Sequence, residues 1–290
     1  MFKLLVDAKQ MPSGASAADW LIFDVRHDLV DHHAGRRAFE LGHIPGAVFL
    51  DHERQLSAPK TGRNGRHPLP ELADFAALMR TQGLTPETQV VVYDAGSGMF
   101  AAHLWWMLRW LGHDKVAVLD GGWQAWLDSG GDVQTGVAGH PSTHRQAAAG
   151  AATYRGPSMP LVDAAAVLAN LAAAEPVFTL LDARASNRFR GDIEPLDPVA
   201  GHIPGALNRP SNLNVTDKGR FKAPAELRAE FNDLLGRRPA SRIVHQCGSG
   251  ISACHNLFAM ELAGLNGSAL YHNSWSEWCC DPARPVATGS

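Results

Sequence analysis

The chain has 290 residues, of which 45% are hydrophobic and 19% charged, and its net charge is −3. The length suggests about two domains or one large α/β domain, and the composition is typical of a globular protein rather than a disordered one. The charge gives no basic surface for nucleic acid or anionic lipid, and no apolar run approaches the roughly 18 residues that a membrane helix needs. The first residues hold too few apolar side chains for a secretory signal, so we expect a cytoplasmic protein that does not engage a membrane.

Short apolar runs alternate with helical patterns along the first half of the chain. Strands are predicted at 21–25, 47–50, 90–93 and 116–119, and helices at 71–82, 100–111 and 122–129. The segment 57–70 is long for a connection inside a compact domain, and long loops often carry function. A stretch rich in Gly, Ala, Ser, Thr and Pro follows at 136–159 and is predicted to be a linker.

The second half of the chain repeats the order of elements seen in the first. Strands are predicted at 177–181, 206–208, 242–246 and 268–271, and helices at 163–173, 224–235, 252–263 and 275–279. The motif Gly42-His43-Ile44-Pro45-Gly46-Ala47 returns as Gly201-His202-Ile203-Pro204-Gly205-Ala206. From Gly96-Ser97-Gly98 onward the two copies stay in one register, which pairs Trp123 with Trp275. We therefore infer a duplication into domains 1–135 and 160–290, each an α/β domain with a mainly parallel sheet.

The four cysteines all follow residue 246, at positions 247, 254, 279 and 280. They are too clustered to form a disulfide framework, and no C-x-x-C pair or nearby histidine gives zinc spacing. We expect no metal site.

One cysteine ends a predicted strand and is followed by a glycine-rich turn and a helix. Gly248 and Gly250 let the chain curl so that backbone N–H groups point inward, and the positive end of helix 252–263 faces the same turn. Ser249 and Ser252 add hydroxyl donors. Such a cradle would stabilise a thiolate or a persulfide at Cys247 without a cofactor, although a buried, inert cysteine would look the same in sequence.

The turn can be compared with that of cysteine phosphatases and with the equivalent turn of the first copy. Cysteine phosphatases carry an arginine at the sixth position after the cysteine, but here that position is Ala253, so the fork that clamps phosphate is missing. In the first copy the residue opposite Cys247 is Ala95. We therefore expect one nucleophile per chain.

The tandem copies, the paired D-x-R and G-H-I-P-G-A motifs and the loop C-G-S-G-I-S-A together resemble the rhodanese superfamily of sulfurtransferases, over roughly 4–130 and 160–287. The resemblance implies two tandem rhodanese-like domains and a two-step, covalent transfer. The neutral Gly248-Ser249 pair resembles the cysteine loop of those family members that use 3-mercaptopyruvate as sulfur donor. Cys247 would then take the sulfur as a persulfide, pyruvate would leave, and a thiol such as thioredoxin, or cyanide, would accept the sulfur.

The family motifs also imply roles for individual residues. Cys247, Ser249 and His67 would form the catalytic group, with Glu53 as the carboxylate behind the histidine. Arg188 would bind the carboxylate of the donor. The loop and helix start would complete the substrate site, through Gly248, Gly250, Ile251, Ser252 and Ala253. By contrast, the D-x-R pairs Asp24/Arg26 and Asp182/Arg184 are predicted to be structural, because an acid and a base two residues apart at a strand end can brace the neighbouring loop. The repeated His43 and His202 are predicted to be structural because only one copy carries the nucleophile.

One departure from the family pattern leaves the donor open. A second arginine is expected shortly after Arg188, but the segment 192–200 contains no basic residue. Arg190, or Arg63 or Arg66 from the long loop, could take its place. A thiosulfate:cyanide sulfurtransferase therefore stays as an alternative, and so does a slow-turnover persulfide carrier that docks a partner.

Overall fold

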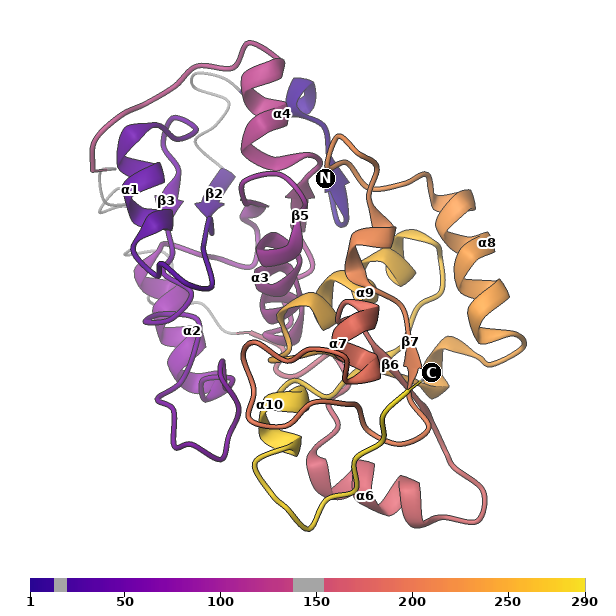
Figure 1. Ribbon diagram of the computed structural model, residues 1–290. Helices are drawn as coiled ribbons and strands as arrows, with labels where there is room; N and C mark the ends of the chain where they lie inside the picture. The colour runs from indigo at the N-terminus through magenta and orange to yellow at the C-terminus, as the bar shows by residue number, and fades with distance from the viewer. Residues whose placement is uncertain (13–19, 138–153, 290) are drawn as a thin grey trace. The chain divides into compact units, whose positions relative to one another are not determined.

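The computed structural model describes residues 1–12, 20–137 and 154–289, which form two compact units (Figure 1). Unit 1 comprises 1–58, 70–158 and 216–221, and unit 2 comprises 59–69, 159–215 and 222–290. The long loop that carries His67 therefore belongs to the unit that also contains Cys247. Most of the predicted linker, 138–153, lies outside the described residues.

Unit 1 is built on a parallel sheet with the strand order β1-β5-β4-β2-β3. Strand β4 lies at its centre and is buried along its whole length, as expected for a parallel strand covered on both faces. The strands are β1 (Leu5–Val6), β2 (Trp20–Asp24), β3 (Val48–Phe49), β4 (Gln89–Tyr93) and β5 (Val116–Leu119). The helices are η1 (Ala8–Gln10), α1 (Ala34–Leu41), α2 (Leu72–Thr81), α3 (Met99–Trp110) and α4 (Gly122–Asp128).

Unit 2 repeats this plan with the parallel order β7-β6-β8-β9. An isolated parallel bridge between Leu161 and Leu270 stands where β1 pairs with β5 in unit 1. The strands are β6 (Thr179–Asp182), β7 (Leu207–Asn208), β8 (Ile243–Gln246) and β9 (Ala269–Leu270). The helices are α6 (Ala164–Ala172), α7 (Ser186–Arg190), η3 (Ser211–Asn214), α8 (Pro224–Leu235), η4 (Ala240–Arg242), α9 (Ile251–Leu262) and α10 (Ser274–Trp278).

The predicted α/β class and parallel sheets are confirmed, and every predicted strand and helix is present within a few residues of its expected ends. The sequence did not predict β1, α1 and α7. These elements have two, eight and five residues, and neither α1 nor α7 begins with a side-chain cap that would mark its start in the sequence.

The two D-x-R pairs have the structural role predicted for them. Arg26 binds the Asp24 carboxylate and donates to the carbonyl of Gly42 at 2.7 Å. Arg184 makes the equivalent bond to the carbonyl of Gly201 at 2.8 Å. Each pair therefore holds the start of a G-H-I-P-G-A turn against the end of a strand.

The repeated histidines and tryptophans also belong to the architecture of the two units. His43 and His202 each bond a backbone carbonyl through Nδ1 at 2.8 Å. Trp275 and Trp278 are fully buried in the core of unit 2. No helix among the described residues is long and apolar enough to cross a membrane.

Candidate active site

The cysteine loop of unit 2 connects β8 to α9 and is held by the start of α10. The Cys247 N–H donates to Ser274 Oγ at 3.0 Å, and the Cys247 carbonyl accepts from Trp275 N–H at 3.0 Å. Cys247 is only 2% exposed, and the Gly250 N–H donates to its sulfur at 3.1 Å. Gly250 has a φ of +90°, and a side chain there would meet the His272 carbonyl oxygen at 2.4 Å. The loop therefore needs glycine at this position to wrap around the sulfur.

The equivalent loop of unit 1 shows what its backbone can bind. The Asp94 carboxylate accepts N–H bonds from Gly96 and Gly98 at 3.0 Å each, from Phe100 at 2.9 Å and from Ala101 at 3.3 Å. The backbone of this loop is thus an anion cradle, and the anion is the protein's own side chain.

In unit 2 the residue in the position of Asp94 is the neutral Gln246, so the cradle is not filled by a carboxylate from that position. The residues that would supply its N–H groups, by the same register, are the predicted Gly248, Gly250, Ser252 and Ala253. Ile251 begins α9, whose positive end faces the loop. The arrangement suits a negatively charged sulfur at Cys247.

The predicted serine and histidine meet in unit 2. His67 Nδ1 lies 2.8 Å from Ser249 Oγ, and both side chains are buried. The loop that carries His67 is anchored to α10, because the Arg66 N–H donates to Ser276 Oγ at 3.0 Å. These contacts bring a histidine from the first half of the sequence to the cysteine loop of the second half.

Two guanidinium groups lie against the same loop. A Cβ atom on Gly248 would be 2.6 Å from Arg66 Nη2 and 3.6 Å from both Nη atoms of Arg188. Of the three residues considered as replacements for the missing arginine, Arg66 is therefore the one found here. Arg190 pairs with Asp192 on the surface, and Arg63 lines a separate cavity of about 250 Å³ with Cys280.

Two buried acids accompany these arginines, and sequence reasoning did not single them out. Glu194 accepts from Arg188 at 2.7 Å, and Asp197 bonds to Arg66 and lies 3.3 Å from Arg188 Nη2. Burial raises the pKa of Glu194, but bonds from Arg188 and from the backbone of Leu196 and Asp197 outweigh it and lower that pKa overall. Ser274 was also missed, because a serine that supports a loop through one hydroxyl carries no sequence signal.

Glu53 lies in unit 1, where Oε1 is 3.6 Å from His32 Nδ1. It follows Asp51, whose carboxylate accepts the Glu53 N–H at 3.0 Å. The local turn therefore fixes the backbone of Glu53, and the predicted role of its carboxylate stays a prediction.

The remaining cysteines differ from Cys247 in their surroundings. Burial, together with the nearby Cys247, raises the pKa of Cys254 well above its usual value, and burial raises the pKa of Cys279 to about 12. Both therefore stay as neutral thiols at physiological pH. Cys280 is exposed, and its thiol donates to the carbonyl of Ser276.

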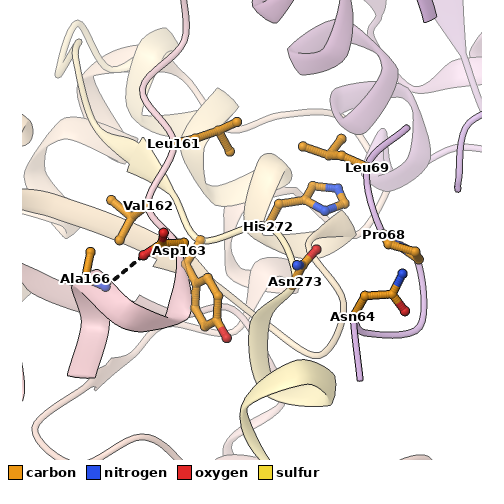
Figure 2. Close-up of a pocket in the computed structure, with 10 residues that line it drawn as sticks. Asn64, Pro68, Leu69, Leu161, Val162, Asp163, Ala166, His272 and Asn273 are labelled. Carbon is orange, nitrogen blue, oxygen red and sulfur yellow. Dashed lines mark hydrogen bonds between the residues drawn. The ribbon is translucent and has the colours of Figure 1, made fainter. Parts of the chain in front are cut away.

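A cavity of about 540 Å³ lies in unit 2 between the His67 loop, the start of α6 and the turn after β9 (Figure 2). Its lining includes Pro68 and Leu69, which follow His67, and His272, whose ring packs against Gly250. Burial lowers the pKa of His272 to about 3, so this ring is neutral. Cys247 itself does not line the cavity, which adjoins the cysteine loop through His272.

Comparison with known proteins identifies both halves of the chain. The family model for the rhodanese-like domain matches twice, at residues 7–129 and 163–280. The chain is 47% identical over 287 residues, 98% of either chain, to a probable 3-mercaptopyruvate sulfurtransferase of Pseudomonas aeruginosa. It is also 39% identical over 289 residues, 99% of this chain and 98% of the other, to a putative thiosulfate sulfurtransferase of Mycobacterium tuberculosis.

Solved structures agree with these relatives. The SseA structure of Escherichia coli, described as showing the rhodanese fold and mechanism of 3-mercaptopyruvate sulfotransferases, matches with a TM-score of 0.76 and 31% identity. The match covers 93% of this chain and 98% of that one.

Proposed function

This chain belongs to the rhodanese family and is a sulfurtransferase, and we propose that it moves sulfur from 3-mercaptopyruvate through a persulfide on Cys247 to a thiol acceptor. The observation that carries the proposal is the joint placement of Arg66 and Arg188 against Gly248, one residue from a sulfur that accepts a backbone N–H bond. A small donor with a carboxylate at one end and sulfur at the other fits that pair of groups.

In the first step the Cys247 thiolate attacks the donor sulfur. The carbon–sulfur bond breaks, its electron pair passes to the carbon as the enolate of pyruvate, and a proton completes pyruvate. The outer sulfur stays on Cys247 as a persulfide, whose negative form the loop N–H groups stabilise. The His67–Ser249 pair, 2.8 Å apart, supplies the proton path, and Glu53 is proposed from the family motif alone as the carboxylate that orients His67.

In the second step an acceptor thiolate attacks the outer sulfur of the persulfide. The sulfur–sulfur bond breaks, and its electron pair returns to Cys247 as the thiolate. A sulfurtransferase needs an acceptor molecule for the transferred sulfur. Thioredoxin, in the cytoplasm that the sequence favours, is our proposal for the acceptor, and cyanide would serve in an assay.

Initial rates with 3-mercaptopyruvate and with thiosulfate, each over a range of concentrations, test the donor. We expect a higher kcat/KM with 3-mercaptopyruvate. A clear preference for thiosulfate would favour the second candidate, thiosulfate:cyanide sulfurtransferase, the activity named for the relative from Mycobacterium tuberculosis. A persulfide that forms but never turns over would instead indicate a carrier.

Substitution of the arginines tests the binding geometry within the same assay. Arg66→Ala should raise KM for 3-mercaptopyruvate about tenfold or more, the effect of losing one charge-assisted hydrogen bond. Arg63→Ala is the matched control, because Arg63 stands three residues away and lines another cavity. Equal effects of the two substitutions would contradict the assignment of Arg66 to the donor carboxylate.

A further inference from the structure

We propose that Asp197, together with Glu194, acts as a charge filter that sets the donor specificity of the site. These carboxylates neutralise the two arginines that face the cysteine loop, so the site accepts a monoanionic donor and disfavours a dianionic one. The inference rests on the proposed sulfur-transfer function and extends it from the binding of the donor to the choice of donor.

The segment that follows α7 carries both acids and contacts both arginines. Asp197 Oδ1 bonds to Arg66 Nη1, and its Oδ2 lies 3.3 Å from Arg188 Nη2, so one carboxylate spans both guanidinium groups. Its side chain is only 3% exposed, although an isolated acid in an open loop would be solvated. The Glu194 carboxylate fixes the backbone of the segment, since its Oε1 accepts the N–H groups of Leu196 and Asp197 at 3.1 and 3.2 Å.

The charges around the loop balance one for one. Arg66, Arg188 and the deeper Arg184 face three acids, Asp197, Glu194 and Asp182, and Glu194 also lies 3.4 Å from Arg184 Nη1. The guanidinium groups can still orient a carboxylate by hydrogen bonds, because Arg66 binds Asp197 through Nη1 while Nη2 faces Gly248. They do not add the excess positive potential that a dianion needs.

The two donors differ in how strongly a fixed carboxylate repels them. 3-Mercaptopyruvate carries one negative charge at neutral pH and thiosulfate carries two. The repulsion from a fixed carboxylate grows in proportion to the charge of the donor, so its removal helps thiosulfate by about the square of the factor by which it helps 3-mercaptopyruvate. Asp197→Asn keeps the shape and an acceptor oxygen but removes the charge.

The first experiment measures kcat/KM for both donors in Asp197→Asn. We expect a rise of about threefold for 3-mercaptopyruvate and about tenfold for thiosulfate, so the ratio shifts toward thiosulfate. Glu194→Gln removes the same charge from the same network and should shift the ratio in the same direction, which also covers a folding defect in one variant. Asp192→Asn is the matched control, because this acid is exposed and pairs with Arg190, and it should leave the ratio unchanged.

The second experiment probes the electrostatic potential at the Cys247 sulfur and requires no sulfur transfer. The alkylation rates of Cys247 by iodoacetate, an anion, and by the neutral iodoacetamide are compared by peptide mass spectrometry. Their ratio should rise about threefold in Asp197→Asn and Glu194→Gln and should not change in Asp192→Asn.

The two experiments separate the filter from the function on which it rests. A wild type that transfers sulfur, with ratios unchanged in both network variants, would overturn the filter and leave the function standing. If neither donor reacts but the alkylation ratio rises, the donor chemistry is wrong while the charge assignment holds. A fall in both donor rates with a constant ratio would show that Asp197 only positions the arginines, which also overturns the filter.

Discussion

Replacing Gln246 by Asp should inactivate the site, because the new carboxylate would occupy the backbone anion cradle of the cysteine loop. Asp94 occupies this position in unit 1 and accepts four backbone N–H bonds from the loop that follows. Because unit 2 keeps the loop and helix start in the same register, the new carboxylate should take the N–H groups that would otherwise hold the sulfur anion.

The size of the effect follows from those bonds. A hydrogen bond to a charged group contributes about 1.5–3 kcal/mol, so the loss of two costs the anionic sulfur about 3–6 kcal/mol. The like charge adds about 4 kcal/mol at most for a separation near 4 Å and an effective dielectric constant near 20. We therefore expect kcat/KM to fall by a factor of about 100 or more, which needs only about 2.7 kcal/mol.

The assay is pyruvate release from 3-mercaptopyruvate, with thermal unfolding measured alongside. Gln246→Asn is the matched control, since it has the size of Asp without the charge. Its activity should fall much less than that of Gln246→Asp. Equal activities of the Asp and Asn variants, both folded, would refute the view that this loop is an anion cradle in unit 2.

Three further predictions concern the loops and the buried histidines. Gly248→Ala should displace the tip of Arg66 and raise KM for the donor about tenfold with little loss of stability. Its control is Gly96→Ala at the equivalent position of unit 1, where a Cβ atom meets no atom closer than 3.9 Å and KM should stay unchanged. Equal KM values in both variants would contradict the placement of Arg66. Asp94→Asn should lower the free energy of unfolding by about 2 kcal/mol in urea, because the loop of unit 1 loses its charged acceptor, while persulfide formation on Cys247 persists. Burial lowers the pKa of His245 from 6.5 to about 3, so neutral His245 contributes stability that is complete above pH 6.5 and is lost as the pH falls toward 3. In His245→Asn the slope of the unfolding free energy against pH, between pH 6 and 4, should decrease by about 1.4 kcal/mol per pH unit. An unchanged slope would refute the assignment.

The cysteine loop could be predicted from sequence because its signals are local. A buried strand, two glycines and a helix start follow one another within a few residues of Cys247, and each has a direct physical reading. The duplication presents the same loop twice and thereby shows that the nucleophile Cys247 has only Ala95 as its counterpart in the first copy.

The surroundings of the loop could not be predicted in the same way, because they depend on contacts between distant segments. Arg63, Arg66 and Arg190 are equal candidates in the sequence, and only the position of Arg66 Nη2 against Gly248 distinguishes Arg66 from the other two. Glu194 and Asp197 look like solvated acids of a loop in the sequence, and only the burial of their side chains against Arg188 shows that they belong to the site.

Intact-mass spectrometry after treatment with 3-mercaptopyruvate tests the central claim most directly. The wild type and the exposed-cysteine control Cys280→Ser should each gain one sulfur atom, which peptide mapping should place on Cys247 and which a thiol acceptor should remove. Cys247→Ser should gain none. Full sulfur transfer by Cys247→Ser would contradict the account, whatever the donor.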